Sequence, residues 1–66
     1  MYYNKLRKIR KDKGMTLKKL SELSGVSMGY LCHLEQGSRR NPSIEKMERI
    51  AKALDKTIFE IFFNEL

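Results

Sequence analysis

Apolar residues recur along this chain at the three- and four-residue spacing of amphipathic helices, and no segment keeps the alternation of a strand. Turn signals divide the pattern into five segments, which predict helices over residues 3–13, 17–24, 27–37, 43–54 and 57–66. Connections of about two to six residues between short helices are typical of compact all-α domains. We therefore expect one all-α, five-helix domain over residues 1–66.

Four hydroxyl residues stand where helices are expected to begin, namely Thr16, Ser27, Ser43 and Thr57. A hydroxyl at this position accepts a hydrogen bond from a backbone N–H of the first turn. Thr57 is followed three residues later by Glu60, which is the spacing of a capping box. Gly14 is expected to end the first helix.

The fourth segment carries the clearest apolar stripe, formed by Ile44, Met47, Ile50, Ala51 and Leu54. Such a stripe predicts a helix with one face on the core. The last segment is apolar nearly all round, and we expect Ile58, Ile61 and Phe62 to pack on the fourth helix.

The rest of the last segment, Phe59, Phe63 and Leu66, forms an apolar patch that so small a domain cannot bury. One interpretation is a homodimer interface through residues 57–66, which Tyr2 and Tyr3 could join. The other is that the chain is the N-terminal part of a longer protein, in which a further segment covers the patch.

The chain of 66 residues can form one small core, and its net charge of +6 is distributed unevenly. Residues 1–19 carry eight basic residues and one acidic residue, which gives a net charge of +7. Residues 20–66 carry six basic and seven acidic residues, which gives −1. A one-sided basic field favours binding to nucleic acid, or less often to an anionic membrane surface. The alternative is that these lysines only solvate a helix face.

Several functional classes are disfavoured. One cysteine and one histidine provide neither an internal disulfide nor a plausible zinc site, so no metal or cofactor is expected. No apolar run approaches the ~20 residues of a membrane span, and no signal peptide is recognisable; we expect a cytoplasmic protein. Without a nucleophile–base pair or a Gly-rich phosphate loop, an enzyme is not expected, and no small-molecule ligand is evident.

The second and third segments have the side chains that a helix-turn-helix requires. Small Ser21 permits close helix approach, and Gly25 suits a sharp turn with positive φ. Apolar residues on both helices, Leu20, Val26, Leu31 and Leu34, would fix the crossing.

The stretch GMTLKKLSELSGVSMGYLCHLEQGSRRNPSI resembles helix-turn-helix proteins of the phage Cro/repressor type, also called the XRE family, in particular its SinR-like branch. The resemblance extends from about Leu6 to Phe62. It implies a lambda-repressor-like fold that binds double-stranded DNA, with the third helix in the major groove. Many relatives carry Gln at the start of the second helix to contact a phosphate, whereas this chain has Leu17, and Ser21 replaces the more usual Ala.

By this resemblance, the base contacts fall on Met28, Gly29 and His33, and Ser27 and Cys32 lie nearer the phosphates. Helical spacing places Tyr30 to one side, within reach of the backbone. Relatives run beside the backbone where this chain has Arg39, Arg40 and Asn41. The backbone N–H groups near Thr16 and Leu17 could serve a phosphate without the Gln side chain. The family also pairs an Arg late in the first helix with the Glu that ends the recognition helix, which here are Arg10 and Glu35.

Two lysines at the start of the second helix support this reading on physical grounds. Lys18 and Lys19 stand at the positive end of the helix dipole, where cations are unfavourable. A phosphate docked at that end would reverse the penalty. The alternative is that both lysines are exposed at negligible cost.

The recognition segment lacks Arg, Asn or Gln at 28 and 29, so bidentate base readout is not expected there. Met28 offers contact to a thymine methyl, Gly29 permits close approach, and His33 can donate to guanine or to a phosphate. We thus expect a transcriptional regulator, a bacterial or phage repressor or controller, that binds a near-palindromic operator as a homodimer. The alternative is a protein-interaction module, such as an antitoxin or coactivator, that uses the apolar C-terminal face.

Overall fold

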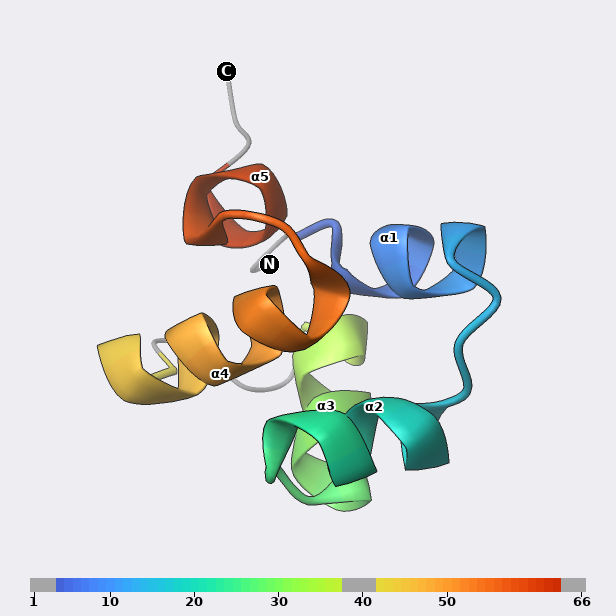
Figure 1. Cartoon of the computed structure of the whole chain (residues 1–66). Helices are drawn as coiled ribbons and strands as arrows, with labels where there is room; N and C mark the ends of the chain where they lie inside the picture. The colour runs from blue at the N-terminus through green and yellow to red at the C-terminus, as the bar shows by residue number, and fades with distance from the viewer. Residues whose placement is uncertain (1–3, 38–41, 64–66) are drawn as a thin grey trace.

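The computed structural model describes residues 4–37 and 42–63, which form five helices and no strand (Figure 1). The helices are α1 (Leu6–Asp12), α2 (Leu17–Ser24), α3 (Met28–Gln36), α4 (Ile44–Leu54) and α5 (Ile58–Phe62). The all-α, five-helix prediction is confirmed. Within the described residues, no helix has the length and apolar character needed to cross a membrane.

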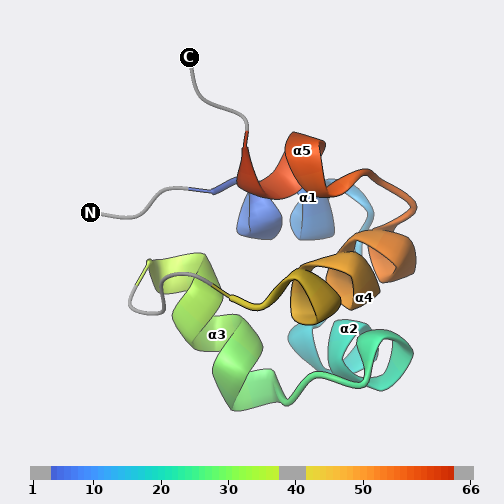
Figure 2. The same ribbon diagram turned by 90° about the vertical axis from the view of Figure 1, so that its left-hand side faces the viewer.

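Figure 2 shows the arrangement of the helices: α1 and α5 lie together at one end, α2 lies at the other, and α4 runs between them. The α3 helix crosses beside this stack and contacts both α1 and α2. The largest fully buried side chains come from all five helices; they are Leu6, Leu20, Leu31, Leu34, Ile50, Leu54 and Ile61. One shared core therefore fixes the orientation of α3 relative to the other helices.

The predicted N-caps are present at the starts of α2, α3 and α4. Each hydroxyl accepts a hydrogen bond from the backbone N–H three residues later; the distances are 3.0 Å for Thr16, 3.2 Å for Ser27 and 3.1 Å for Ser43. At the turn between α2 and α3, Gly25 has φ of 74°, a left-handed conformation that glycine adopts at little cost.

The capping box at α5 is also confirmed. The Glu60 N–H donates to Thr57 Oγ1 over 3.1 Å, and the Thr57 N–H donates to Glu60 Oε1 over 2.8 Å. The pKa of Glu60 is lowered below its usual 4.5, first by the Thr57 backbone hydrogen bond and then by the charge of Lys56. The carboxylate form of Glu60 is therefore the form that the folded protein favours.

The first helix begins at Leu6, three residues later than predicted, because the preceding residues tie the chain to other elements. The Asn4 side chain accepts from Leu6 N–H over 2.9 Å and donates to the Leu34 carbonyl over 3.0 Å. The Lys5 N–H donates to the Ile61 carbonyl over 2.9 Å. Asn4 thus binds the first N–H group of α1 from the residue before the N-cap Lys5, and it links this end of α1 to α3.

Two predictions about the apolar residues are wrong. Ile44 was expected on the buried stripe of α4, yet it is 57% exposed, because the first turn of α4 projects beyond the helices that pack on its later turns (Figure 1). The last helix was expected over residues 57–66, but α5 ends at Phe62, with Phe63 as its C-cap; residues 64–66 lie outside the described residues. Phe63 is exposed, so packing on the core does not stabilise a further turn there. Ile61 and Phe62 are buried and Ile58 is half-buried, and α5 packs on α4 as expected.

Candidate nucleic-acid interface

The α3 helix divides into a buried and an exposed face. Leu31 and Leu34 are fully buried and hold the helix on the core. The three residues to which the resemblance assigned base contacts, Met28, Gly29 and His33, are all exposed, Met28 to 47%. These three residues therefore share a face that is accessible to a ligand.

Gly29 lies in the first turn of α3, and nothing in the fold requires a glycine there. A Cβ built at this position would meet no atom within 4 Å, and the backbone is not in a left-handed conformation. Glycine costs ~1 kcal/mol relative to alanine inside a helix. The fold would therefore accept a larger residue at this exposed position.

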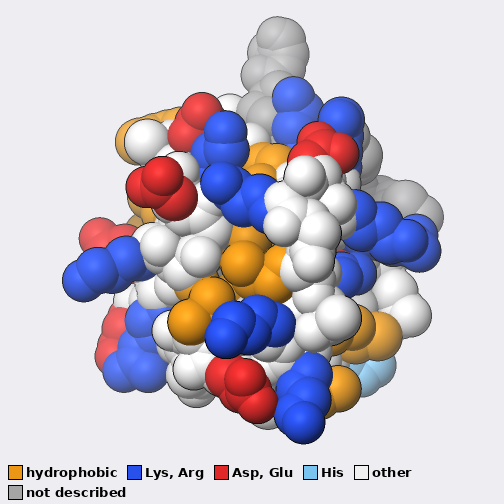
Figure 3. Space-filling model, turned by 45° about the vertical axis from the view of Figure 1, so that its right-hand side comes forward, with side chains coloured by type: hydrophobic (Ala, Val, Ile, Leu, Met, Phe, Trp, Pro, Cys, Tyr) orange, Lys and Arg blue, Asp and Glu red, His pale blue; other side chains and the backbone are white. Residues whose placement is uncertain are grey.

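The start of α2 presents two cations to solvent. Lys18 and Lys19 are both exposed, and no acidic residue stands in the first turn of α2. Leu17 instead packs its side chain against the core, so only its backbone could contact a phosphate. Figure 3 shows that basic side chains predominate over acidic ones on the side of the molecule that carries the α1–α2 connection.

A nearly buried ion pair joins α1 to α3. Arg10 Nε lies 2.6 Å from Glu35 Oε2, and Arg10 Nη2 lies 3.2 Å from Glu35 Oε1, which makes the contact bidentate. Arg10 Nη1 also donates to the Met15 carbonyl over 2.7 Å, in the loop that leads to α2. The Arg10 guanidinium therefore ties together α1, α3 and the loop that leads to α2.

A shallow groove of about 350 Å³ lies beside this ion pair, with Arg7, Leu17, Cys32 and Gln36 also on its walls. Cys32 is half-buried, and Gln36 Nε2 donates to its sulfur over 3.5 Å. The groove joins the start of α2 to the middle of α3, which are the places where the resemblance implied phosphate contacts.

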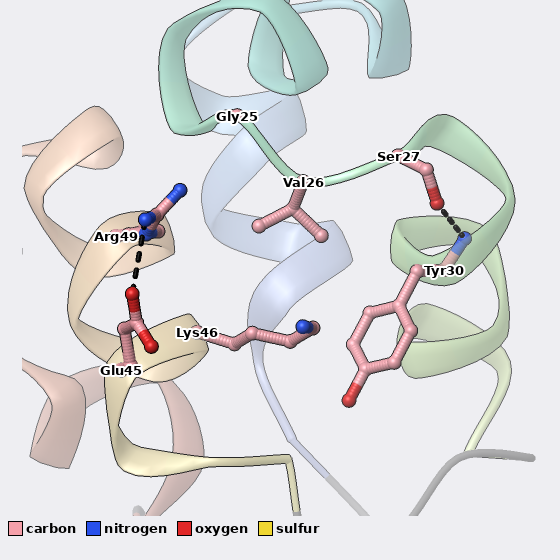
Figure 4. A pocket seen from close by; sticks show the side chains of 7 residues that line it. All are labelled: Gly25, Val26, Ser27, Tyr30, Glu45, Lys46 and Arg49. Carbon is pink, nitrogen blue, oxygen red and sulfur yellow. Dashed lines mark hydrogen bonds and ion pairs between the residues drawn. The ribbon is translucent and has the colours of Figure 1, made fainter.

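Tyr30 lies on the opposite side of α3, next to a residue that the sequence analysis did not single out. Lys46 comes from α4, and its Nζ lies 5.3 Å from the centroid of the Tyr30 ring (Figure 4). Sixteen residues separate the two positions in the sequence. No local pattern could have indicated Lys46, because its position next to α3 depends on how α4 packs.

The other residues predicted for DNA contact or for the dimer interface fall into two groups: some lie outside the described residues, and the others are exposed. Arg39, Arg40 and Asn41 lie outside the described residues, as do Leu66, Tyr2 and Tyr3. Phe59 and Phe63 are 66% and 52% exposed, and their ring centroids are 5.6 Å apart. The two rings thus form an exposed apolar patch on α5.

Comparisons with known proteins agree with this geometry. A family model described as Helix-turn-helix matches residues 6–61. The transcriptional regulator SinR of Bacillus subtilis is 34% identical over 58 residues, which is 88% of this chain and 52% of SinR. The chain thus spans about half the length of this curated relative.

Solved structures resemble the fold closely. The restriction-modification controller protein C.AhdI of Aeromonas hydrophila superposes with a TM-score of 0.79 at 36% identity, over 85% of this chain and 83% of that one. The structure of SinR in complex with DNA superposes with a TM-score of 0.78 at 35% identity, over 82% of this chain and 86% of that one. The structure of SinR in complex with SinI superposes with a TM-score of 0.78 at 34% identity, over 83% of this chain and 53% of that one.

Proposed function

This chain belongs to the XRE-type helix-turn-helix family, and from that membership we propose that it is a sequence-specific DNA-binding regulator of transcription. In this proposal α3 enters the major groove, and the start of α2 contacts the phosphate backbone. The regulator acts by occupying an operator, as a repressor or controller, and performs no chemistry. SinR, a relative, has been crystallised with DNA.

The observation that carries the proposal is the exposed glycine at the start of α3. Gly29 lowers helix stability, and no atom of the fold occupies the space its side chain would fill. A helix that approaches the floor of a groove benefits from a missing side chain, because the backbone can come closer to the base edges. Gly29 is therefore explained by a ligand and not by folding.

The neighbours of Gly29 indicate how bases would be read. Met28 offers an apolar surface to a thymine methyl, and His33, one turn further on, can donate to guanine or to a phosphate. Neither makes the bidentate contact that arginine or glutamine would make. Sequence-dependent DNA shape and phosphate contacts then supply much of the selectivity.

Phosphate contacts are proposed at both ends of the exposed face. At the start of α2 these are Thr16, Leu17, Lys18 and Lys19, with Leu17 acting through its backbone. On α3 they are Ser27, Tyr30 and Cys32, and in the segment outside the described residues they are Arg39, Arg40 and Asn41. Neutralising these phosphates releases counterions, so binding should weaken steeply with salt.

We also propose that two copies bind together through the C-terminal apolar patch of Phe59, Phe63 and Leu66. A dimer places two recognition helices about 34 Å apart, one turn of DNA, and matches a near-palindromic site. The exposure of Phe59 and Phe63 supports this arrangement.

A second candidate is a protein-interaction module that uses the same patch for a different protein, in the manner of an antitoxin or coactivator. Its support is the exposed pair of phenylalanine rings, together with the solved complex of the relative SinR with SinI. Dependence on a separately encoded partner for solubility would favour this candidate.

In vitro selection of duplexes from a random library, at fixed salt, tests the main proposal. We expect an enriched near-palindromic motif with half-sites about ten base pairs apart. The matched control is the Gly29→Arg variant, which keeps the fold but fills the approach space, and it should not enrich the same motif. Absence of any enriched motif with the unaltered chain would overturn the proposal in favour of the interaction module.

A further inference from the structure

A groove of about 410 Å³ opens between the start of α3 and the first turns of α4 (Figure 4). Val26 lies at its centre, Tyr30 lines one side, and Glu45 and Arg49 line the other. Ser27, the exposed N-cap of α3, also borders the groove. The groove therefore reaches the N-terminal end of α3, where Ser27 directly precedes Met28 in the sequence.

The two cations in this groove differ in their charge balance. Arg49 Nη2 lies 2.9 Å from Glu45 Oε2, so its charge is offset by a carboxylate. Lys46 extends from α4 toward the Tyr30 ring and has no carboxylate within ion-pair distance among the described residues. An aromatic ring attracts a cation without neutralising it. The Lys46 ammonium thus faces the Tyr30 ring, and no carboxylate among the described residues offsets it.

We propose that Tyr30 and Lys46 form one phosphate-binding unit, in which the ring positions the Lys46 ammonium for the DNA backbone beside the recognition helix. This inference rests on the proposed function and adds a contact from α4 to those of α2 and α3. The groove would receive a phosphodiester of the strand that passes Ser27.

The reason for a paired arrangement is conformational entropy. A lysine side chain has four rotatable bonds, and ordering it on a ligand reduces the affinity it contributes. A ring that already holds the ammonium removes part of that cost before DNA arrives. The Tyr30 ring accordingly positions Lys46, which contacts the phosphate of this groove, and this role is separate from the contact proposed above for the Tyr30 hydroxyl.

The rival explanation is that the ring–ammonium contact only stabilises the packing of α3 on α4. Salt dependence separates the two explanations, because each phosphate contact adds about 0.9 to the slope of log affinity against log salt. A contact that serves packing alone would not change this slope.

The experiment measures affinity for a duplex of about 30 base pairs that carries the selected motif and has room for two half-sites. We expect Lys46→Gln to reduce the slope by about 1.8, because one contact is lost in each of the two bound copies, so that the variant loses about 12-fold less affinity than the unaltered chain between 50 and 200 mM salt. Lys52→Gln is the matched control, an exposed lysine near the other end of α4, and it should leave the slope unchanged.

Two Tyr30 variants test the positioning role. Tyr30→Phe keeps the ring and loses only the hydroxyl contact, so it should retain most of the affinity, whereas Tyr30→Leu should weaken binding severalfold. The Tyr30→Leu effect should be much smaller when Lys46 is already Gln, since the two residues act together. If Tyr30→Phe and Tyr30→Leu lost the same amount of affinity, the hydroxyl and not the ring would contribute to binding. That result would contradict the Tyr30–Lys46 unit.

A Lys18→Gln variant separates this inference from the proposed function. If Lys18→Gln lowers the slope and Lys46→Gln does not, the Tyr30–Lys46 unit is wrong and the proposed function stands. If the unaltered chain binds neither the selected motif nor mixed-sequence duplex, both are wrong. Thermal melting of each variant checks that weaker DNA binding does not result from unfolding of the variant.

Discussion

Arg10 and Glu35 form a bidentate ion pair between α1 and α3, with 10% and 6% of their side chains exposed. Removing one partner of such a pair lowers the free energy of unfolding by more than the intact pair contributes to it, because the remaining charge stays buried without its partner. The pair lies directly behind the exposed face of α3. Its loss should therefore disturb both the stability of the domain and the placement of the recognition helix.

Glu35→Ala should destabilise the domain by about 3 kcal/mol or more. For a domain of this size, that corresponds to a fall in thermal midpoint of about 12 °C or more. Circular dichroism melting measures it, with Glu48→Ala as the control, since Glu48 is an exposed glutamate on α4. An unchanged midpoint in Glu35→Ala would contradict the structural role of the pair.

Gly29→Ala should raise stability and lower DNA affinity at the same time. The added methyl group meets no atom of the fold, and alanine favours the helix by up to ~1 kcal/mol. The same methyl group would intrude between α3 and the groove floor. Melting and binding measurements on one preparation test both effects, with Lys52→Ala as the control. Stability and affinity that rise together would rule out close approach at Gly29.

Replacing Lys18 and Lys19 together by Gln should lower the salt slope of DNA binding by about 3.6, because each of the two bound copies loses two phosphate contacts. The thermal midpoint should stay the same or rise slightly, since cations at a helix N-terminus are unfavourable. The matched control replaces Lys52 and Lys56, which lie far from the start of α2. If both double variants change the slope equally, the effect is one of net charge and not of position.

Phe63→Glu should convert a dimer into a monomer at micromolar concentration while the domain stays folded, because Phe63 is 52% exposed and not part of the core. Sedimentation measures the change. Leu23→Glu is the matched control, since Leu23 on α2 is also 52% exposed. A monomeric unaltered chain that still binds near-palindromic DNA tightly would argue against this interface.

The capping box at α5 should make stability depend on pH in the acid range. The pKa of Glu60 is lowered in the folded protein, chiefly by the Thr57 backbone hydrogen bond, so its contribution is present above the usual 4.5. It is lost as the pH falls below 4.5 through the lowered pKa. The difference in thermal midpoint between the unaltered chain and Glu60→Gln should therefore shrink toward low pH. A difference that is constant from neutral to acid pH would mean that the charge of Glu60 contributes nothing.

Much of the helical framework could be predicted because its signals are local. The caps at Thr16, Ser27, Ser43 and Thr57 act on N–H groups three residues away, so the sequence pattern contains each hydrogen bond directly. The resemblance then supplied what spacing could not, namely that Arg10 and Glu35 meet across 25 positions.

The errors arose where a local pattern was extended beyond the packing that supports it. Ile44 continues the apolar spacing of α4, but the spacing does not say where the neighbouring helices end. The apolar run after Thr57 likewise continues past the last residue that reaches the core, and α5 stops at Phe62.

The sequence by itself determined the starts of α2, α3, α4 and α5 and the turn at Gly25, because these depend on contacts within a few residues, and helical spacing gave the exposed and buried faces of α3. Only the tertiary structure decided that Asn4 reaches the Leu34 carbonyl, and that Lys46 lies over Tyr30. Those contacts depend on how separate helices cross on a shared core. The exposed face of α3 is thus specified by local sequence, and the residues that position it come from distant parts of the chain.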